Sequence, residues 1–395
     1  MANSNREILW TKDFIFTSVV NFVMMLSMYL LLVTMATYSM QEYNASISLA
    51  GFVASIFVIG SLIGRLYAGK KIAEMGNKKM LMTRIIAFFI VTIMYFLPLG
   101  LIGMMIIRLF HGIFLGMATT ATGTIIAQVI PATRKGEGIG YFSMSIVLAT
   151  AVGPLIGTFL VSGFGFTSIF IFSVVMAAVS LILSLFLNPP EITQPKEELK
   201  EKKGFSFSEY FEKHALPISA AMFVMAVAYS GILSFVTEYA SSINLMQAGG
   251  FFFLVYGVSV LISRPVTGPL MDSKGANIVV YPSLVLFALG LLLISQASTG
   301  FIFLTAAVLL GLGYGNFQSI AQAIAIKLTP PHRMGLANST YFIALDLGLG
   351  VGPLLLGYLV PATGYRGMYF SLVFLVIIGI VVYYFVHGRK DKEMA

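Results

Sequence analysis

The chain has 395 residues, of which 58% are hydrophobic and only 10% are charged, with a mean hydropathy of +0.92. Soluble domains carry about 45–50% apolar and about 25% charged residues, so this composition excludes an ordinary soluble protein and indicates a membrane protein. The formal net charge is +8, and the absence of cysteine excludes disulfides and thiolate metal sites.

Hydrophobic stretches of about 20 residues, long enough to cross a hydrocarbon core of about 30 Å as helices, follow one another along the chain. The first half predicts helices near 14–37, 46–69, 80–98, 103–129, 138–161 and 166–188. The second half predicts helices near 216–239, 247–270, 277–297, 300–327, 336–360 and 367–387. We therefore predict an all-α membrane protein with 12 transmembrane helices in two six-helix repeats. The predicted bundles span 1–188 and 216–395, and the hydrophilic segment 189–215 joins them as a cytoplasmic linker.

Lysine and arginine set the predicted orientation, because positively charged loops stay on the cytoplasmic side. With the N-terminus inside, the basic residues of the termini, the linker and the inner loops face the cytoplasm, and only Arg366 faces outward. The predicted location is a bacterial cytoplasmic membrane, crossed many times, with both termini cytoplasmic. This topology, with contact to anionic membrane lipids, explains the net charge of +8. A nucleic-acid partner is excluded, since no basic residues cluster on a soluble domain.

Glycines, prolines and intramembrane arginines recur along the chain with a shift of 199 positions. These residue types have strict backbone or charge requirements, so their shared register indicates two copies of one structural unit. The pairs include Gly51/Gly250, Arg65/Arg264, Gly69/Gly268, Gly76/Gly275, Gly112/Gly311, Gly116/Gly315, Pro131/Pro330, Arg134/Arg333, Gly136/Gly335, Gly153/Gly352, Pro154/Pro353 and Gly165/Gly364. Two internal repeats in a membrane are the usual architecture of alternating-access transporters.

The loop after the second predicted helix combines glycine, acidic and basic residues. It begins at Gly69, has Ala73 and Glu74 four and five positions later, and continues with Gly76 and two lysines. Its second-half copy runs through Arg264, Gly268, Asp272 and Gly275. Along essentially its whole length, the chain resembles the major facilitator superfamily, whose members have such a Gly–acid–Gly–basic loop.

This resemblance implies a gate on the cytoplasmic side. A tight loop needs its glycines, and the acid can pair with an arginine or a helix N-terminus when that side is shut. Ala73 occupies the family's usual acidic position, which makes the first copy weaker than the second. The alternative is that both loops are simple turns with positive-inside charge. The expected gate residues are Arg65, Gly69, Glu74, Gly76, Arg134, Arg264, Gly268, Asp272, Gly275 and Arg333.

The fourth predicted helix contains Arg108 and His111, similar to the family's Arg-x-x-Gln-Gly element with His111 in place of the glutamine. An arginine in a membrane span costs about 2.5–3.5 kcal/mol on insertion scales, so it is expected to face a cavity or a partner. The resemblance to the family's proton-coupled drug exporters implies that Arg108 takes part in proton transfer, and His111 can titrate near neutral pH. Snorkelling of Arg108 and a packing role for His111 are the alternatives.

The fifth predicted helix favours export over uptake. Exporters of the family resemble Gly-x8-Gly-x3-Gly-Pro-x2-Gly-Gly at this place, and this chain matches four of the six positions. The residues there are Gly140, Ala149, Gly153, Pro154, Gly157 and Thr158, and the Gly-Pro recurs as Gly352 and Pro353. Small residues let helices approach closely and Gly-Pro lets a helix bend, so this face is expected to shape the contact between the halves. Generic small-residue packing is the alternative.

Asp346 is the one carboxylate that falls well inside a predicted span, roughly 16 Å from its cytoplasmic end at about 1.5 Å per residue. Such a carboxylate tends to be protonated when isolated and ionises when a cation or an arginine approaches. We therefore expect Asp346 to couple transport to protons, with a structural hydrogen-bonding role as the alternative. Sodium in place of protons is also open. Glu238, near the outer end of its helix, is a second candidate for coupling.

Aromatic and polar residues on helices near the expected transport pathway are candidates for substrate binding. Most of the 33 Phe, 18 Tyr and 22 Met must face lipid or other helices, and a minority would line a central cavity. The mixture suits an amphiphilic compound better than a sugar. The candidates are Asn21, Met25, Tyr29, Tyr229, Phe235, Tyr314, Asn316, Gln318, Tyr341 and Phe342.

The predicted function is secondary active efflux, in which protons enter while a small amphiphilic compound or drug leaves. The alternatives are export of a specific native metabolite (a sugar, a metallophore or a lipid), proton-coupled uptake, and a transporter-like sensor that moves nothing. The expected partners are a small-molecule substrate, protons and membrane lipids, and the chain is expected to act as a monomer. No cofactor or metal is expected beyond the proton gradient as energy source. No phosphate loop, zinc spacing or nucleophile elbow points to an enzyme.

Overall fold

The computed structural model describes residues 7–190 and 206–391, which form helices joined by turns and short loops. The first half contains α1 (Lys12–Tyr43), α2 (Ile47–Met75), α3 (Asn77–Ile93), α4 (Gly100–Val129), α5 (Lys135–Phe164) and α6 (Phe166–Leu185). The second half contains α7 (Leu216–Ser242), α8 (Met246–Lys274), α9 (Asn277–Ser295), α10 (Gly300–Leu310), α11 (Asn316–Lys327) and α12 (Met334–Val386). A π-helical segment, η4 (Gly311–Gly315), connects α10 to α11. The short 3-10 helices are η1 (Met94–Phe96), η2 (Ala132–Arg134), η3 (Phe207–Glu209), η5 (Pro331–Arg333) and η6 (Gly388–Lys390).

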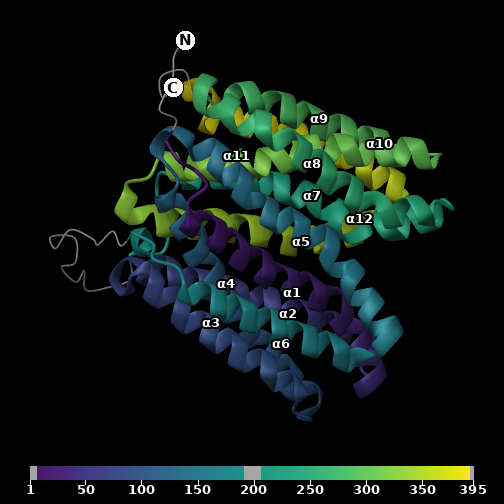
Figure 1. Ribbon diagram of the computed structural model, residues 1–395. Coiled ribbons are helices and arrows are strands. Elements are labelled where there is room, and N and C mark those ends of the chain that lie inside the picture. Colours follow the sequence, from purple (N-terminus) through teal and green to yellow (C-terminus); the bar gives the residue numbers. More distant parts are fainter. Residues whose placement is uncertain (1–6, 191–205, 392–395) are drawn as a thin grey trace.

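The helices form two bundles that lie side by side (Figure 1). The bundles touch where α2 meets α12 and where α5 meets α8. The start of α7 and the end of α12 lie at the same end of the molecule, at the left of Figure 1. We call this end, which also carries η2, η3 and η5, the linker side. Toward the opposite end the axes of the two bundles diverge (Figure 1). On the linker side, contacts of Asp272 with α5 and of Lys70 with Glu209 join the halves, so the molecule is closed there.

The structure confirms an all-helical membrane fold over the described residues. Eleven helices are long and apolar enough to cross a membrane. The predicted spans 336–360 and 367–387 both fall on α12, which is counted as one helix of 53 residues although Gly364 interrupts it with φ 68° and ψ 174°. The count of twelve spans and the domain boundaries therefore stay predictions. The middle of the predicted linker lies outside the described residues.

Repeat-related glycines take the same unusual backbone conformation in both halves. Gly76 and Gly275 have φ of 83° and 86° where α2 and α8 end, and Gly165 has φ of 77° between α5 and α6, like Gly364 in α12. Side chains with a Cβ rarely adopt these angles, so glycine is required at each turn. The shift of 199 positions is therefore a repeat of backbone geometry as well as of sequence.

Candidate functional site at the boundary between the halves

Asp272, near the end of α8, binds the first turn of α5 across the boundary. Its Oδ1 accepts a hydrogen bond from the backbone N of Gly136 at 2.8 Å, and its Oδ2 accepts one from the backbone N of Glu137 at 2.8 Å. A carboxylate at a helix N-terminus satisfies free N–H groups and is favoured by the helix dipole. One turn earlier on α8, a Cβ on Gly268 would come within 2.5 Å of the Cα of Glu137. The glycine thus lets the two helices touch, and the carboxylate fixes them together.

The first-half copy of this loop contributes no acid to the boundary. Ala73 stands 199 positions before Asp272 and carries no carboxylate. Glu74 forms an ion pair of 2.7 Å with Lys71 of its own helix, which is its only ion pair in the described part of the chain. Contrary to expectation, the structure places Glu74 outside the contact between the halves, because a shift of one residue turns its side chain to a different face of α2.

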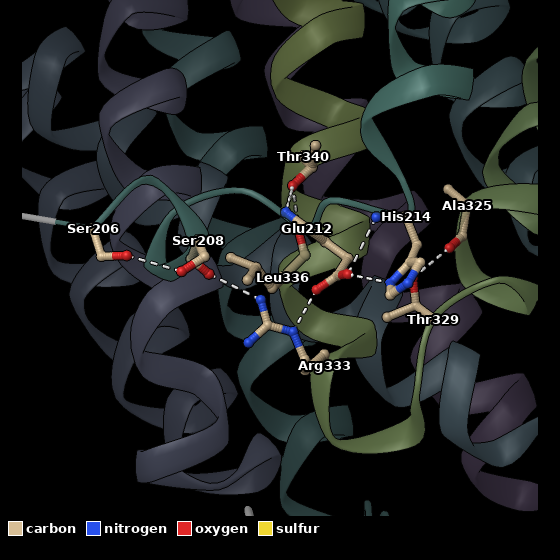
Figure 2. Close-up of polar contacts among 9 residues, drawn as sticks. All are labelled: Ser206, Ser208, Glu212, His214, Ala325, Thr329, Arg333, Leu336 and Thr340. Carbon is tan, nitrogen blue, oxygen red and sulfur yellow. Dashed lines mark hydrogen bonds and ion pairs between the residues drawn. The ribbon is translucent and has the colours of Figure 1, made fainter. Parts of the chain in front are cut away.

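Residues 206–215, the end of the linker, cross the linker side and form a segment that we call the strap (Figure 2). Its Glu212 is only 1% exposed and forms an ion pair with Arg333. The same carboxylate lies 2.7 Å from Nδ1 of His214, and the backbone N of Glu212 donates to Oγ1 of Thr340 at 2.9 Å. These contacts attach the strap to the beginning of α12.

The strap also contacts the first half, through Lys70 of α2. Nζ of Lys70 lies 2.7 Å from Oε2 of Glu209 and 4.6 Å from the ring centroid of Tyr210. Both pairs are partly exposed to solvent, which screens them and keeps their contribution small. Together with the pair of Glu212 and Arg333, they connect the two halves independently of the α8–α5 contact.

A difference between the repeats explains why Arg333 pairs with the strap. In the first half, Arg134 pairs with Glu137 three positions later, with 2.7 Å between Nη2 and Oε1. In the second half, the residue three positions after Arg333 is Leu336, and Glu212 supplies the missing carboxylate. Burial alone would raise the pKa of the Glu212 carboxyl, but its hydrogen bonds outweigh burial and lower that pKa below its ordinary value.

Deeper in the boundary, Asp346 of α12 forms an ion pair with Arg65 of α2. The distance between Oδ2 and Nε is 2.7 Å, and the two side chains are 17% and 5% exposed. Arg65 also donates to Oγ1 of Thr119 at 3.2 Å, and its guanidinium lies over the ring of Phe342, 4.6 Å from the centroid. Ser339 donates to the backbone carbonyl of Arg65 at 2.7 Å. The sequence predicted Asp346 for coupling and Arg65 for gating, and the structure joins the two residues in one pair.

Tyrosines from both halves gather next to this ion pair. Tyr29 of α1 interacts electrostatically with both of its members. Tyr229 of α7 stacks on Tyr314 of η4, with ring centroids 3.9 Å apart, and Tyr256 of α8 lies 5.7 Å from Tyr229. Tyr341 of α12 donates to a backbone carbonyl of α11 at 2.5 Å. The structure therefore brings Tyr29, Tyr229, Tyr314 and Tyr341 together, as expected of residues around one central site.

Arg108 and His111 lie inside the first bundle rather than at the boundary. Both are fully buried. Nε of Arg108 donates to the backbone carbonyl of Val53 on α2 at 3.2 Å, and the ring of His111 stacks on Phe88 of α3 with centroids 4.5 Å apart. Arg108 therefore does not snorkel to the headgroups. The structure separates both residues from Asp346, and their part in proton transfer stays a prediction.

Several predicted binding residues lie away from the central tyrosines. Asn21 donates to Oγ of Ser145 at 2.8 Å within the first half. Asn316 lines a cavity of about 240 Å³ that opens between α8 and α9. The others are Met25 in the first-half core, Gln318, which is half-buried on α11, and Phe235 near the outer end of α7. Glu238, the second candidate for coupling, is exposed near the same end of α7.

The glycine face of α5 packs mainly within the first half. A Cβ on Gly153 would come 2.8 Å from the Cβ of Tyr29, and one on Gly157 would come 3.2 Å from a backbone carbonyl of α1. The second-half counterpart of Gly153 packs on α7 in the same way. Of the motif glycines 140, 153 and 157, Gly140 alone meets the other half, where it lies against Arg264. The expectation that this face shapes the contact between the halves therefore applies to Gly140 alone.

Sequence reasoning missed Thr119, Tyr256, Glu209 and Glu212. Tyr256 lies eight positions before Arg264, two helical turns away, so helical spacing alone could have placed the two on one face. The two glutamates stand in the hydrophilic segment 189–215, which the sequence predicts only as a linker. Their partners are distant in sequence, and no local pattern marks them.

Comparison with known proteins agrees with this geometry. The family model described as "Major Facilitator Superfamily" matches residues 17–281 and again residues 245–394. The chain belongs to the major facilitator superfamily. It is therefore a membrane-embedded transporter of a family whose members are generally not enzymes, and the resemblance predicted from the loop motifs is confirmed.

Relatives within the superfamily include exporters. The chain is 26% identical to an uncharacterized MFS-type transporter of Methanocaldococcus jannaschii, over 92% of this chain and 96% of that protein. It is 22% identical to the staphylopine export protein of Staphylococcus aureus, over 85% and 87% of the two chains, and 25% identical to the multidrug resistance protein MdtG of Citrobacter koseri, over 87% and 86%. The fold is similar to that of the human organic anion transporter MFSD10, with a TM-score of 0.76 at 14% identity, over 94% and 98% of the chains.

Proposed function

We propose that this transporter exports a small amphiphilic compound across the bacterial cytoplasmic membrane in exchange for protons. The observation that carries the proposal is the ion pair of Arg65 and Asp346, because it joins the halves and contains a partly exposed carboxylate. Similarity to MdtG and to the staphylopine export protein supports the outward direction. In this proposal the linker side and both termini are cytoplasmic.

The ion pair links protonation to alternating access in the following way. With the linker side closed, ionised Asp346 attracts Arg65 and holds α12 against α2. A proton arriving from outside neutralises the carboxylate and removes most of that attraction. The halves then separate on the linker side, the proton leaves to the cytoplasm, and the compound enters. Once Asp346 is ionised again, it attracts Arg65, the linker side closes, and the compound is released outward.

A second candidate is the export of one specific native metabolite. It is favoured by the similarity to the staphylopine export protein, which spans 85% of this chain. The two candidates differ in the range of compounds that they transport, since a specific exporter moves one metabolite and does not transport unrelated dyes.

The proposal is tested by flux in proteoliposomes that contain purified protein and carry an imposed pH gradient. We expect amphiphilic dyes to move against the protons and to stop when the gradient is dissipated. Movement in the same direction as the protons would instead indicate uptake. Absence of dye movement under every gradient would reject multidrug exchange and favour the single-metabolite exporter.

The strap provides a prediction for the gate on the linker side. We expect Glu212→Gln to open this side more often, because Arg333 loses its carboxylate. Replacing this charge-assisted hydrogen bond with a neutral one removes roughly 1–1.5 kcal/mol, so the open state gains about five- to tenfold at most. Leu336 lies beside Gly69 of α2 and is 6% exposed in the closed structure. Because the chain has no cysteine, Leu336→Cys introduces a single thiol at this place as a reporter. Its labelling by a water-soluble maleimide reports opening of the linker side.

The matched control is Glu74→Gln, which removes a carboxylate on the same side whose partner lies on its own helix. Labelling in this control is expected to match the parent. Since the pKa of Glu212 is lowered, its stabilisation is complete above the ordinary glutamate pKa of about 4.3 and is lost as pH falls through the lowered value. The parent and Glu212→Gln should therefore still differ at pH of about 6 and about 8, since both values lie above that pKa. Equal labelling of the two proteins at neutral pH would show that the strap does not hold the gate.

A further inference from the structure

Arg264 of α8 is a buried guanidinium that has no carboxylate partner among the described residues. Its side chain is among the largest that are fully buried, and the residue is 1% exposed. Nη1 donates to Oγ of Ser319, and Nη2 donates to the backbone carbonyl of Gly315 at 2.9 Å. Nε has no hydrogen-bond partner in residues 7–190 and 206–391. A charge buried in a membrane span is costly and is kept where it serves an ion or a substrate.

The repeat shows what Arg264 lacks. Its counterpart 199 positions earlier is Arg65, which pairs with Asp346 of the other half. The residue 199 positions before Asp346 is Val147 of α5, and a Cβ on Gly257 of α8 would lie 3.7 Å from its Cγ1. Val147 therefore faces α8 as an apolar residue where the other half has an acid. Among the residues that the structure describes, the boundary near the midplane holds two guanidiniums, of Arg65 and Arg264, and one carboxylate, of Asp346, which leaves one positive charge without compensation.

The groups around Arg264 are hydrogen-bond donors rather than acids. The hydroxyl of Tyr256 would lie 3.3 Å from a Cβ on Gly315, whose carbonyl accepts from Arg264, and Tyr341 donates to the carbonyl of Gln318, the residue before Ser319. The hydroxyl of Tyr314, directly before Gly315, is also buried without a hydrogen-bond partner in the described part of the chain. A buried, uncompensated guanidinium with an N–H that lacks an acceptor matches the hydrogen-bonding needs of an anion.

We propose that Arg264 binds a carboxylate of the exported compound when the linker side is open. In the closed structure Gly140 of α5 covers the side chain of Arg264. A Cβ added to Gly140 would lie 3.5 Å from Cδ of Arg264. Asp272 holds α5 in that position from two turns further along α8. Separation of α5 from α8 uncovers the guanidinium toward the linker side, where an exported compound enters. Closure returns α5 and leaves no room for the carboxylate, so the compound is released. The inference rests on the proposed export function and adds the substrate's chemical class.

Three probes with one fluorophore test this inference: dansyl-glycine, which is anionic, dansyl-glycinamide, which is neutral, and dansyl-cadaverine, which is cationic. We expect proteoliposomes with a pH gradient to exchange dansyl-glycine fastest. Arg264→Gln should slow that exchange by about tenfold or more, the effect of one lost charge-assisted hydrogen bond, while Arg264→Lys keeps part of it. Arg366→Gln is the matched control, since Arg366 donates to a backbone carbonyl outside the central site.

Val147→Asp keeps Arg264 and tests the same point without removing a buried charge. The new acid occupies the repeat position of Asp346, so it should pair with Arg264 and compete with dansyl-glycine. Transport of dansyl-glycine by Val147→Asp should fall, while transport of dansyl-cadaverine by the same variant should persist. If Arg264→Gln and Val147→Asp both exchange dansyl-glycine like the parent, the inference is wrong. Flux of radiolabelled chloride that depends on Arg264, without flux of dansyl-glycine, would also overturn it in favour of an inorganic ion.

These outcomes are distinct from failure of the proposed function. Proton-driven transport of dansyl-cadaverine alone, lost in Asp346→Asn, would leave proton-coupled export standing and remove only the carboxylate site. Failure of all three probes under every gradient would reject both proposals for compounds of this class.

Discussion

We expect Asp346→Asn to abolish proton-driven exchange while the protein still folds in the membrane. Asparagine keeps the size of the side chain and one hydrogen bond to Arg65, but it cannot exchange a proton. Replacing a charge-assisted hydrogen bond with a neutral one removes roughly 1–1.5 kcal/mol, so the closed linker side also loses about five- to tenfold in population. Counterflow of substrate without a gradient should continue, whereas uphill transport should fall to the level of empty liposomes.

Two control variants separate this coupling role from a structural one. Asp346→Glu retains a titratable carboxyl and is expected to keep measurable exchange with a changed pH dependence. Glu238→Gln removes the other predicted coupling carboxylate, which is exposed at the outer end of α7, and should leave exchange unchanged. Uphill transport by Asp346→Asn at the rate of the parent would refute the coupling assignment. Loss of exchange in Glu238→Gln alone would transfer the role to Glu238.

The sequence could predict the fold because its signals are local and repeated. Each apolar stretch is long enough to cross a membrane, and a helix satisfies its own backbone hydrogen bonds there. The glycines at 76, 165, 275 and 364 share a register in the sequence, which predicts the repeat without any knowledge of long-range contacts. The structure then gives all four glycines a positive φ. The count of twelve spans stays a prediction, since the two spans predicted at 336–360 and 367–387 both fall on α12, which Gly364 interrupts.

The site was only partly predictable, because its pairs join residues far apart in the sequence. Asp346 was recognisable from its depth in a predicted span, and Arg65 from its counterpart in the second repeat, Arg264. Their pairing depends on how α2 and α12 pack, which neither helix encodes alone. Arg108 was recognisable as an intramembrane charge, but its hydrogen bond to Val53 lies within the first bundle, and its part in proton transfer stays a prediction. Glu212 could not be placed at all, because a charged linker gives no indication of which residues fold back onto a helix.

We expect Gly268→Ala to hold the linker side open. A Cβ at this position would lie 2.5 Å from the Cα of Glu137, 3.0 Å from its backbone N and 3.1 Å from the carbonyl O of Gly136. All three are backbone atoms of α5, so no side-chain rotation relieves the clash, and α5 must move away from α8. Overpacking of this kind costs about 1–3 kcal/mol, which favours the open linker side by about 5- to 150-fold. The same displacement lengthens the hydrogen bonds of Asp272 to α5 and weakens that contact further.

The measurement is maleimide labelling of the Leu336→Cys reporter, together with exchange in proteoliposomes. Labelling should rise and exchange should slow, because the transporter returns less often to the state that releases the compound outward. Gly250→Ala is the matched control, as Gly250 lies on the same helix and its ideal Cβ meets nothing within 4 Å. Both glycines gain the same helix propensity on becoming alanine, so any difference between them comes from the contact with α5. Equal labelling in the two variants would mean that α5 and α8 do not separate when the linker side opens, and the gate would then have to lie between α2 and α12.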